Sequence, residues 1–220
     1  MPLQGNQRTK LDDTDDNLFY SYPRFVTHVD DGFIQQLTDV YRERLKPNTR
    51  IFDMMSSWVS HLPEEMEFAH VEGHGLNEEE LAKNPRLNHY FVQNLNANPQ
   101  LPLPDAEFDA VVNCVSVQYL QYPDAIFAEV HRILKPGGVA IFSFSNRMFY
   151  QKAIEAWREG SESDRVELVK RYFDSVKGVN IPGFSKPEVI VRKANLPSFM
   201  QMLRIGSGDP FYAVVAYRQS

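Results

Sequence analysis

The sequence contains a single cysteine, Cys114, among its 220 residues, so no disulfide can form within the chain. This scarcity fits a protein of a reducing compartment, and we expect a cytoplasmic location. No uninterrupted apolar run approaches the ~18 residues that suggest a membrane-spanning helix. The N-terminus also lacks the apolar segment of a signal peptide. We therefore expect no membrane span. Cys114 itself lies in an apolar run and is interpreted as a core residue rather than a nucleophile.

The chain also lacks a surplus of basic residues. Its 23 Lys and Arg are outnumbered by 29 Asp and Glu, which gives a formal net charge of −6. Nucleic-acid-binding domains usually carry the opposite balance, so no nucleic-acid partner is expected. The histidines are scattered, and neither a metal-ligand cluster nor a nucleophile triad is found. No metal is predicted, and nothing in the sequence specifies an oligomeric state.

The most informative stretch is 108–146, which has the pattern of a strand, a helix and a second strand. Residues 110–115 form a short, valine-rich apolar run, typical of a strand buried on both faces. Pro123 can begin a helix whose apolar residues recur at helical spacing until Pro136-Gly137-Gly138 ends it. A second apolar strand follows over 139–144. Such strand–helix–strand units build parallel sheets, so the predicted fold class is α/β.

Similar patterns predict the other elements. Five further strands are predicted, over 50–53, 68–72, 89–93, 188–192 and 211–217. Asp31 is interpreted as the cap of one helix and Asn77 as the cap of another. Two more helices are predicted over 148–157 and 163–176, either to shape a substrate pocket or simply to cover the sheet.

The stretch 101–146 resembles the later half of class I S-adenosylmethionine-dependent methyltransferases, in particular their type 11-like small-molecule branch. The resemblance is carried by Leu101-Pro102-Leu103-Pro104-Asp105, by Phe108-Asp109-Ala110-Val111, and by Glu129-Val130-His131-Arg132-Ile133-Leu134-Lys135-Pro136-Gly137-Gly138. It implies a doubly wound, Rossmann-like, mostly parallel seven-stranded sheet with an antiparallel C-terminal hairpin. We accordingly divide the chain into 1–47, comprising an N-terminal tail, an aromatic cap and a helix, and 48–220, a methyltransferase-like domain.

The resemblance implies methyl transfer from S-adenosylmethionine to a small-molecule acceptor. In doubly wound folds the ligand lies outside the carboxyl ends of the strands. The residues that the resemblance places against the cofactor are Asp53, Met55, Ser56, Ser57, Gly73, Gly75, Asn94, Leu95, Asn96, Val115 and Ser116. Among them, Asp53 is expected to receive the ammonium of the methionine moiety.

The loop after the first strand departs from the family's pattern. Met55, Ser57 and Val59 stand where the family has three glycines, which let a backbone approach a ligand closely and adopt positive φ. Ser56 and Ser57 can still offer hydroxyl and backbone N–H donors to the carboxylate of the methionine moiety. We interpret the loop as a divergent cofactor site with a polar replacement for the glycines.

Two further departures concern the ribose and the adenine. Gly75 stands where the family has an acidic residue that binds both ribose hydroxyls, and Glu72 comes three residues early. Asn94 replaces the usual aspartate near the adenine, but it can supply both a carbonyl acceptor and an amide donor. These departures leave open an alternative, a catalytically silent methyltransferase-like binding or interaction protein. A nicotinamide-dependent oxidoreductase is a less favoured alternative, because this sequence also lacks the glycines of a dinucleotide-binding loop.

No catalytic residue is assigned, but polar side chains near the expected reaction side are candidates: Tyr22, His28, His61, Tyr119 and Asn146. Positioning can supply much of the catalysis of methyl transfer, and a base is needed only when the acceptor must lose a proton. The aromatic segment 18–28 is either a lid over the site, with Arg24 among its polar groups, or a cover for the sheet edge. The acidic segment 1–17 is predicted to be a mobile tail.

Overall fold

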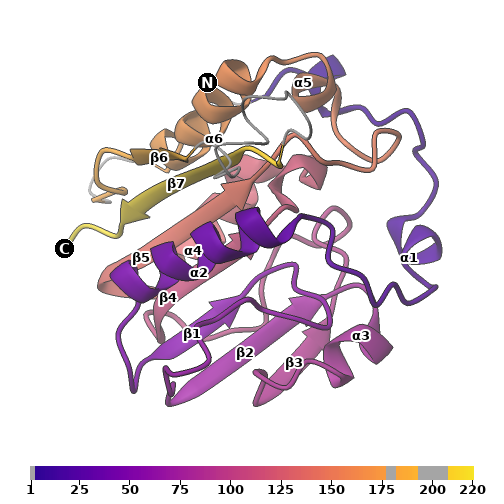
Figure 1. The fold of residues 1–220 in the computed structure, drawn as a ribbon. Helices are drawn as coiled ribbons and strands as arrows, with labels where there is room; N and C mark the ends of the chain where they lie inside the picture. The colour runs from indigo at the N-terminus through magenta and orange to yellow at the C-terminus, as the bar shows by residue number, and fades with distance from the viewer. Residues whose placement is uncertain (1–2, 177–181, 193–207) are drawn as a thin grey trace, which may run out of the picture.

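A seven-stranded sheet runs through the molecule in the order β3-β2-β1-β4-β5-β7-β6 (Figure 1). The structure, a computed structural model, describes residues 3–176, 182–192 and 208–220. The strands are β1 (Arg50–Asp53), β2 (His70–Gly75), β3 (His89–Val92), β4 (Phe108–Cys114), β5 (Leu134–Phe144), β6 (Glu188–Arg192) and β7 (Phe211–Tyr217). β1 to β5 are parallel, whereas β7 runs antiparallel to both β5 and β6. The predicted fold class and the C-terminal hairpin are confirmed.

Helices cover both faces of the sheet. They are α1 (Asp16–Phe19), α2 (Asp31–Arg44), α3 (Glu78–Ala82), α4 (Pro123–Ile133), α5 (Glu155–Arg158) and α6 (Glu162–Asp174), with 3₁₀ turns η1 (Asn6–Arg8) and η2 (Val117–Tyr119). α2 packs on one face through a core that includes Phe33 and Ile51. α4 and α6 pack on the other through a core that includes Phe127. No helix in the described parts of the chain is long and apolar enough to cross a membrane.

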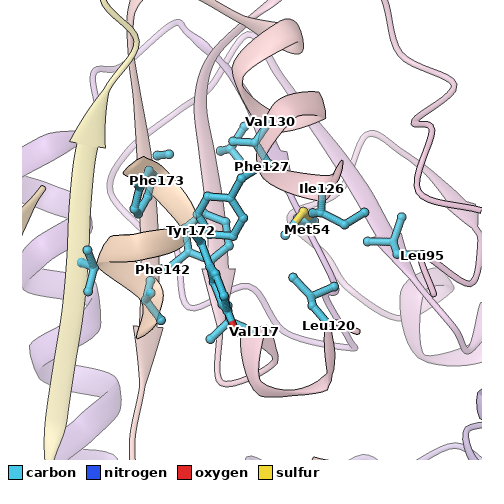
Figure 2. Close-up of a cluster of buried hydrophobic side chains, with 14 of the residues drawn as sticks. Met54, Leu95, Val117, Leu120, Ile126, Phe127, Val130, Phe142, Tyr172 and Phe173 are labelled. Atoms are coloured by element: carbon cyan, nitrogen blue, oxygen red, sulfur yellow. The ribbon is translucent and has the colours of Figure 1, made fainter. Parts of the chain in front are cut away.

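The core under α4 and α6 combines aromatic rings with aliphatic side chains (Figure 2). The ring centroids of Phe127 and Phe142 lie 4.5 Å apart and stacked, and Phe173 meets Phe127 edge-on at 4.8 Å. All three side chains are fully buried. Burying each such side chain contributes about 1.5–3 kcal/mol. This packing fixes β4 and β5, whose carboxyl ends carry part of the site described below.

Three predicted elements need correction. The strand predicted over 139–144 begins earlier, because β5 starts at Leu134, so Pro136-Gly137-Gly138 lies within this strand and does not end the helix. The second strand was predicted over 68–72, but β2 begins at His70 and continues through Gly75, since the Gly-rich end still pairs with β3. Most of the predicted helix 148–157 is absent: only α5 is helical there, and Ile154 precedes it in extended conformation. The Ile154 N–H bonds instead to the carbonyl of Gln118. The cap of α2 is Asp30 rather than Asp31, and the Asn77 cap of α3 is confirmed.

The segment predicted as a mobile tail is docked on the domain from residue 3 onward. The Arg8 guanidinium donates to the carbonyl of Gln121 at 3.0 Å and to the carboxylate of Asp124 at 3.2 Å. The fully buried ammonium of Lys152 donates to the carbonyl of Thr14 at 2.7 Å and lies 3.2 Å from Asp12. The prediction was wrong because two of the acidic residues that suggested a solvated tail, Asp12 and Asp16, are ion-pair partners of lysines.

Candidate active site

A cavity of about 270 Å³ lies where the strand order reverses, outside the carboxyl ends of β1, β2, β3 and β4. The N-terminal segment 16–29 and residues 147–149 after β5 complete its wall. All the predicted cofactor-binding residues line this cavity except Gly73. A Cβ on Gly73 would come within 2.4 Å of the Leu87 side chain, so this glycine faces packing rather than the cavity.

The loop after β1 keeps a glycine-like turn without a glycine. Met55 has a φ of 57°, in the left-handed region that glycine adopts without strain. The conformation costs a non-glycine residue about 1–2 kcal/mol. The Met55 N–H donates to Nδ1 of His74 at 3.1 Å, and the Ser56 N–H donates to the His74 carbonyl at 2.6 Å. The replacement of the first glycine therefore strains the turn, and hydrogen bonds from β2 hold it.

His74, within β2, connects the loops that follow β1 and β3. Its Nδ1 accepts from Met55, so Nε2 carries the proton and donates to the carbonyl of Gln93 at 2.8 Å. Burial lowers the pKa of this imidazole to about 4, against a smaller raising effect of the Gln93 carbonyl. The ring is therefore neutral near pH 7. Sequence analysis left His74 among scattered histidines, because its partners lie 19 residues away on either side.

Asp53, at the end of β1, carries a buried carboxylate into the cavity wall. Its Oδ2 accepts a hydrogen bond from the Ser56 hydroxyl at 2.6 Å. Burial raises the pKa of this carboxyl to about 6, while the bonds from Ser56 and Ser60 act in the opposite direction. None of the described cationic side chains forms an ion pair with it. Such a carboxylate is suited to receive an ammonium group, because a bound cation would offset its desolvation.

Neither Gly75 nor Glu72 brings a carboxylate to the cavity. A Cβ on Gly75 would lie 2.7 Å from the backbone carbonyl oxygen of Ser56, so this end of β2 excludes any side chain. Glu72 is buried within the sheet, where its two oxygens lie 2.6 Å from Nδ1 of His89 and 2.8 Å from Nε2 of His70. The acidic position expected at this point of the fold is therefore sterically closed.

α3 supplies a carboxylate instead, from Glu80. Its Oε2 accepts from the Ser57 hydroxyl at 2.6 Å, and its Oε1 accepts from the Arg24 N–H at 2.6 Å. The Asn77 amide donates to the carbonyl of Tyr20 at 2.8 Å. The first turn of α3 thus ties residues 20–24 to the cavity wall. From the sequence, the only predicted role in this turn was that of Asn77 as a helix cap.

Three of the five catalytic candidates line the cavity: His28, His61 and Tyr119. Tyr22 is 81% exposed and Asn146 is exposed, and neither belongs to the wall. Burial raises the pKa of Tyr119 to about 12, so its phenol stays protonated near pH 7. Burial lowers the pKa of His61 to about 4 and also lowers that of His28, so both imidazoles are neutral and able to accept a proton.

The described residues give little support to catalysis by a cysteine nucleophile or by a bound metal ion. Burial raises the pKa of the Cys114 thiol to about 12, which keeps it protonated and unreactive. Across residues 3–176, 182–192 and 208–220, no group of three or more His, Cys, Asp or Glu side chains could hold a metal ion. The cavity is thus a site of hydrogen-bond donors, acceptors and aromatic rings.

Comparisons with known proteins agree with this picture. The family model for a methyltransferase domain matches residues 59–142. The chain is 33% identical over 72 residues to a malonyl-[acyl-carrier protein] O-methyltransferase of Serratia marcescens, covering 33% of this chain and 27% of that protein. It is 41% identical over 86 residues to the biotin biosynthesis bifunctional protein BioHC of Saccharophagus degradans, covering 32% and 15%. The matched part thus spans less than a third of either relative.

Two solved structures illustrate the shared fold. Phosphoethanolamine N-methyltransferase 2 of Haemonchus contortus, in complex with S-adenosyl-L-methionine, superposes with a TM-score of 0.56 at 15% identity, over 84% of this chain and 52% of that one. A SAM-dependent methyltransferase from Archaeoglobus fulgidus gives a TM-score of 0.58 at 14% identity, over 84% and 92%. At these identities the likeness concerns the fold.

Proposed function

We propose that this chain, which belongs to the class I S-adenosylmethionine-dependent methyltransferase family, transfers the methyl group of S-adenosylmethionine to a small-molecule acceptor. The observation that carries the proposal is Asp53. It is a buried carboxylate at the carboxyl end of β1, without an ion-pair partner in the described chain, beside a tight turn that faces the cavity. An ammonium group next to a carboxylate, as in the methionine moiety, would complete this arrangement.

The other residues of the wall fit the remaining parts of the cofactor. Ser56 and Ser57 bring hydroxyl groups and a backbone turn to the same end of the cavity. The Asn94 Oδ1 accepts the Asn96 N–H at 3.0 Å, which leaves the Asn94 amide group as the donor available to a ring nitrogen of adenine. Leu95 contributes an apolar surface for packing on the adenine.

The chemistry requires positioning more than proton transfer. When bound, the cofactor supplies a methyl group already activated on a sulfonium. The protein's task is to hold an acceptor in line and exclude water, an effect that reaches about 7–11 kcal/mol in the best models. For an acceptor that must lose a proton, the neutral imidazoles of His28 and His61 are candidate bases in the same cavity.

The size of the cavity favours a small acceptor over a macromolecule. Its volume of about 270 Å³ is near the lower end of the range for ligand pockets, about 300–1,000 Å³. Residues 16–29 form part of the cavity wall and thereby narrow the entrance through which an acceptor reaches the site. Of the similar proteins, one is named for a small molecule, phosphoethanolamine, and another for a malonyl group carried on an acyl-carrier protein.

The alternative is a catalytically silent binding protein on the same scaffold. It is favoured by the strained Met55 and by the closed acidic position at Gly75. The two functions are separated by incubating the purified chain with methyl-labelled S-adenosylmethionine and a broad panel of small acids, amines, alcohols and thiols. Label in any acceptor, together with stoichiometric S-adenosylhomocysteine, supports the methyltransferase. Binding of the cofactor without transfer to any acceptor favours the silent protein.

A further inference from the structure

Arg24 brings a guanidinium without an acidic partner to the wall of the cavity. We propose that this guanidinium binds a carboxylate of the acceptor, so that the substrates of this site are carboxylic acids. The inference rests on the proposed function and deepens it by naming the acceptor class.

Aromatic rings and backbone carbonyls hold the Arg24 side chain. Its Cζ lies 4.7 Å from the ring centroid of Phe19, 5.4 Å from that of Phe149 and 5.8 Å from that of Tyr20. Nη2 donates to the Phe19 carbonyl at 3.0 Å, and Nη1 lies 3.5 Å from the Tyr22 carbonyl. A guanidinium has five N–H donors, so about three remain for a ligand, in the planar fork that matches a carboxylate.

None of the acids of the cavity wall forms an ion pair with the Arg24 guanidinium. Asp16 pairs with Lys10 at 2.6 Å. Asp53 accepts from serine hydroxyls. Glu80 accepts the backbone N–H of Arg24, not its guanidinium. The residues outside the described ranges, 1–2, 177–181 and 193–207, contain no Asp or Glu, so none of them supplies an acidic side chain.

Arg147 provides the contrast within the same wall. Its Nε donates to Asp209 at 2.7 Å, so its charge is already balanced. Of the two arginines that line the cavity, only Arg24 carries an unbalanced charge within the described chain. A carboxylate entering the cavity would meet this guanidinium first as an ion-pair partner.

Arg24 shares contacts to one aromatic residue, Phe149, with two of the candidate catalytic residues. The His28 ring centroid is 5.3 Å from that of Phe149, the same ring that Arg24 contacts. The Phe149 N–H donates to the Tyr119 hydroxyl at 2.8 Å. Arg24, His28 and Tyr119 therefore surround one ring that follows β5. The proposed ammonium site at Asp53 lies at the end of β1, where the Ser56 hydroxyl donates to Asp53 and the Ser57 hydroxyl donates to Glu80.

The test compares acids with their amides. Wild-type protein saturated with S-adenosylhomocysteine is titrated with a panel of small mono- and dicarboxylic acids and the matched primary amides, by calorimetry and thermal unfolding. The titrations are repeated with Arg24→Gln and Arg24→Lys, and with Arg147→Gln as the matched control. We expect at least one acid to bind at least tenfold more tightly than its amide in the wild type and in Arg147→Gln. We expect that preference to vanish in Arg24→Gln and to return in part in Arg24→Lys, with affinity for S-adenosylhomocysteine within about twofold throughout.

Other outcomes overturn the proposal in distinguishable ways. If Arg24→Gln weakens S-adenosylhomocysteine itself tenfold or more, the guanidinium binds the cofactor's carboxylate and not the acceptor's. If no acid is preferred over its amide in the wild type, the cavity has no acceptor anion site, while the proposed function stands. If the wild type does not bind S-adenosylhomocysteine, the proposed function fails and this inference fails with it.

Discussion

The backbone N–H of Met55 donates a hydrogen bond to Nδ1 of His74 at 3.1 Å, from the left-handed conformation that a glycine would adopt without strain. The buried imidazole of His74 also donates to Gln93, so one side chain joins the turn after β1 to the loop after β3. The turn that has Met55 in place of a glycine is thus stabilised by a hydrogen bond to the neighbouring strand β2, and the shape of the cavity depends on that bond.

We expect His74→Ala to lower the free energy of unfolding and the affinity for S-adenosylhomocysteine together. Two backbone groups would lose their partner, at about 1–3 kcal/mol for each one left buried and unsatisfied. His131→Ala is the control, because His131 is also buried and also bonds a carbonyl, that of Pro182 at 2.7 Å, but outside the cavity. Urea unfolding and calorimetry should show that the control loses stability only. Equal affinity in both variants would refute the role of His74.

The second prediction concerns the stability of the ligand-free protein. The pKa of Asp53 is about 6 in the folded state, against 3.8 as the reference value. The folded state holds this proton more tightly, so the resulting stabilisation is complete below pH 3.8 and is lost as the pH rises through 6. At pH 7.5 the buried carboxylate therefore costs about 2–3 kcal/mol. We expect Asp53→Asn to be more stable than the wild type at pH 7.5 and nearly equal to it at pH 4, in urea unfolding. A gap that does not change with pH would contradict this.

The third prediction concerns the pH dependence of cofactor binding. If Asp53 receives the ammonium of the cofactor, affinity for S-adenosylhomocysteine should fall as the pH drops below about 6, where the carboxyl is protonated. His61 and His74 do not interfere, because their pKa values are lowered to about 4. Calorimetry between pH 5 and 8 should give a loss that approaches tenfold per pH unit at the acidic end. Asp53→Asn should bind weakly and with no such slope, and a slope unchanged by the substitution would exclude Asp53 as the titrating group.

The fourth prediction concerns the missing ribose acid. We expect Gly75→Asp to lower the free energy of unfolding by about 1–3 kcal/mol without tightening cofactor binding, because its Cβ would collide with the Ser56 carbonyl. Gly5→Asp is the control, since nothing lies within 4 Å of the Cβ position there. Thermal unfolding measures the stability of both variants, and calorimetry measures their affinity for S-adenosylhomocysteine. A stable Gly75→Asp variant with higher affinity would mean that the strand end opens to accept a side chain.

The sequence predicted the centre of the parallel sheet well because β4 and the second half of β5 are apolar runs with clear breaks. Pro123 begins α4, and Gly137 has a positive φ of 79° within β5, where the pairing with β4 shifts its register. The end of β2 was harder to predict. Gly73-His74-Gly75 has the composition of a turn, but it forms part of the strand and pairs with β3. Those glycines serve close packing, against the Leu87 side chain and the Ser56 carbonyl, which composition alone does not reveal.

The candidate site could be predicted only where the fold fixes the register. Residues at strand ends, such as Asp53 and Asn94, line the cavity as expected. His74 and Glu80 acquire their roles from partners distant in the sequence: Glu80 bonds to Arg24, 56 residues earlier. Tyr22, a predicted catalytic candidate, is exposed instead of lining the cavity. Its segment is short and irregular, so it has no periodicity from which to infer which side chains point inward.

The most direct test is a calorimetric titration of the purified chain with S-adenosylhomocysteine and S-adenosylmethionine. We predict saturable binding at one site and, at a hundredfold excess over the dissociation constant, a gain in stability of ~2.7 kcal/mol. No heat and no stabilisation with either compound would contradict a working cofactor site behind Met55 and His74. The search would then turn from a methyl acceptor to a binding partner.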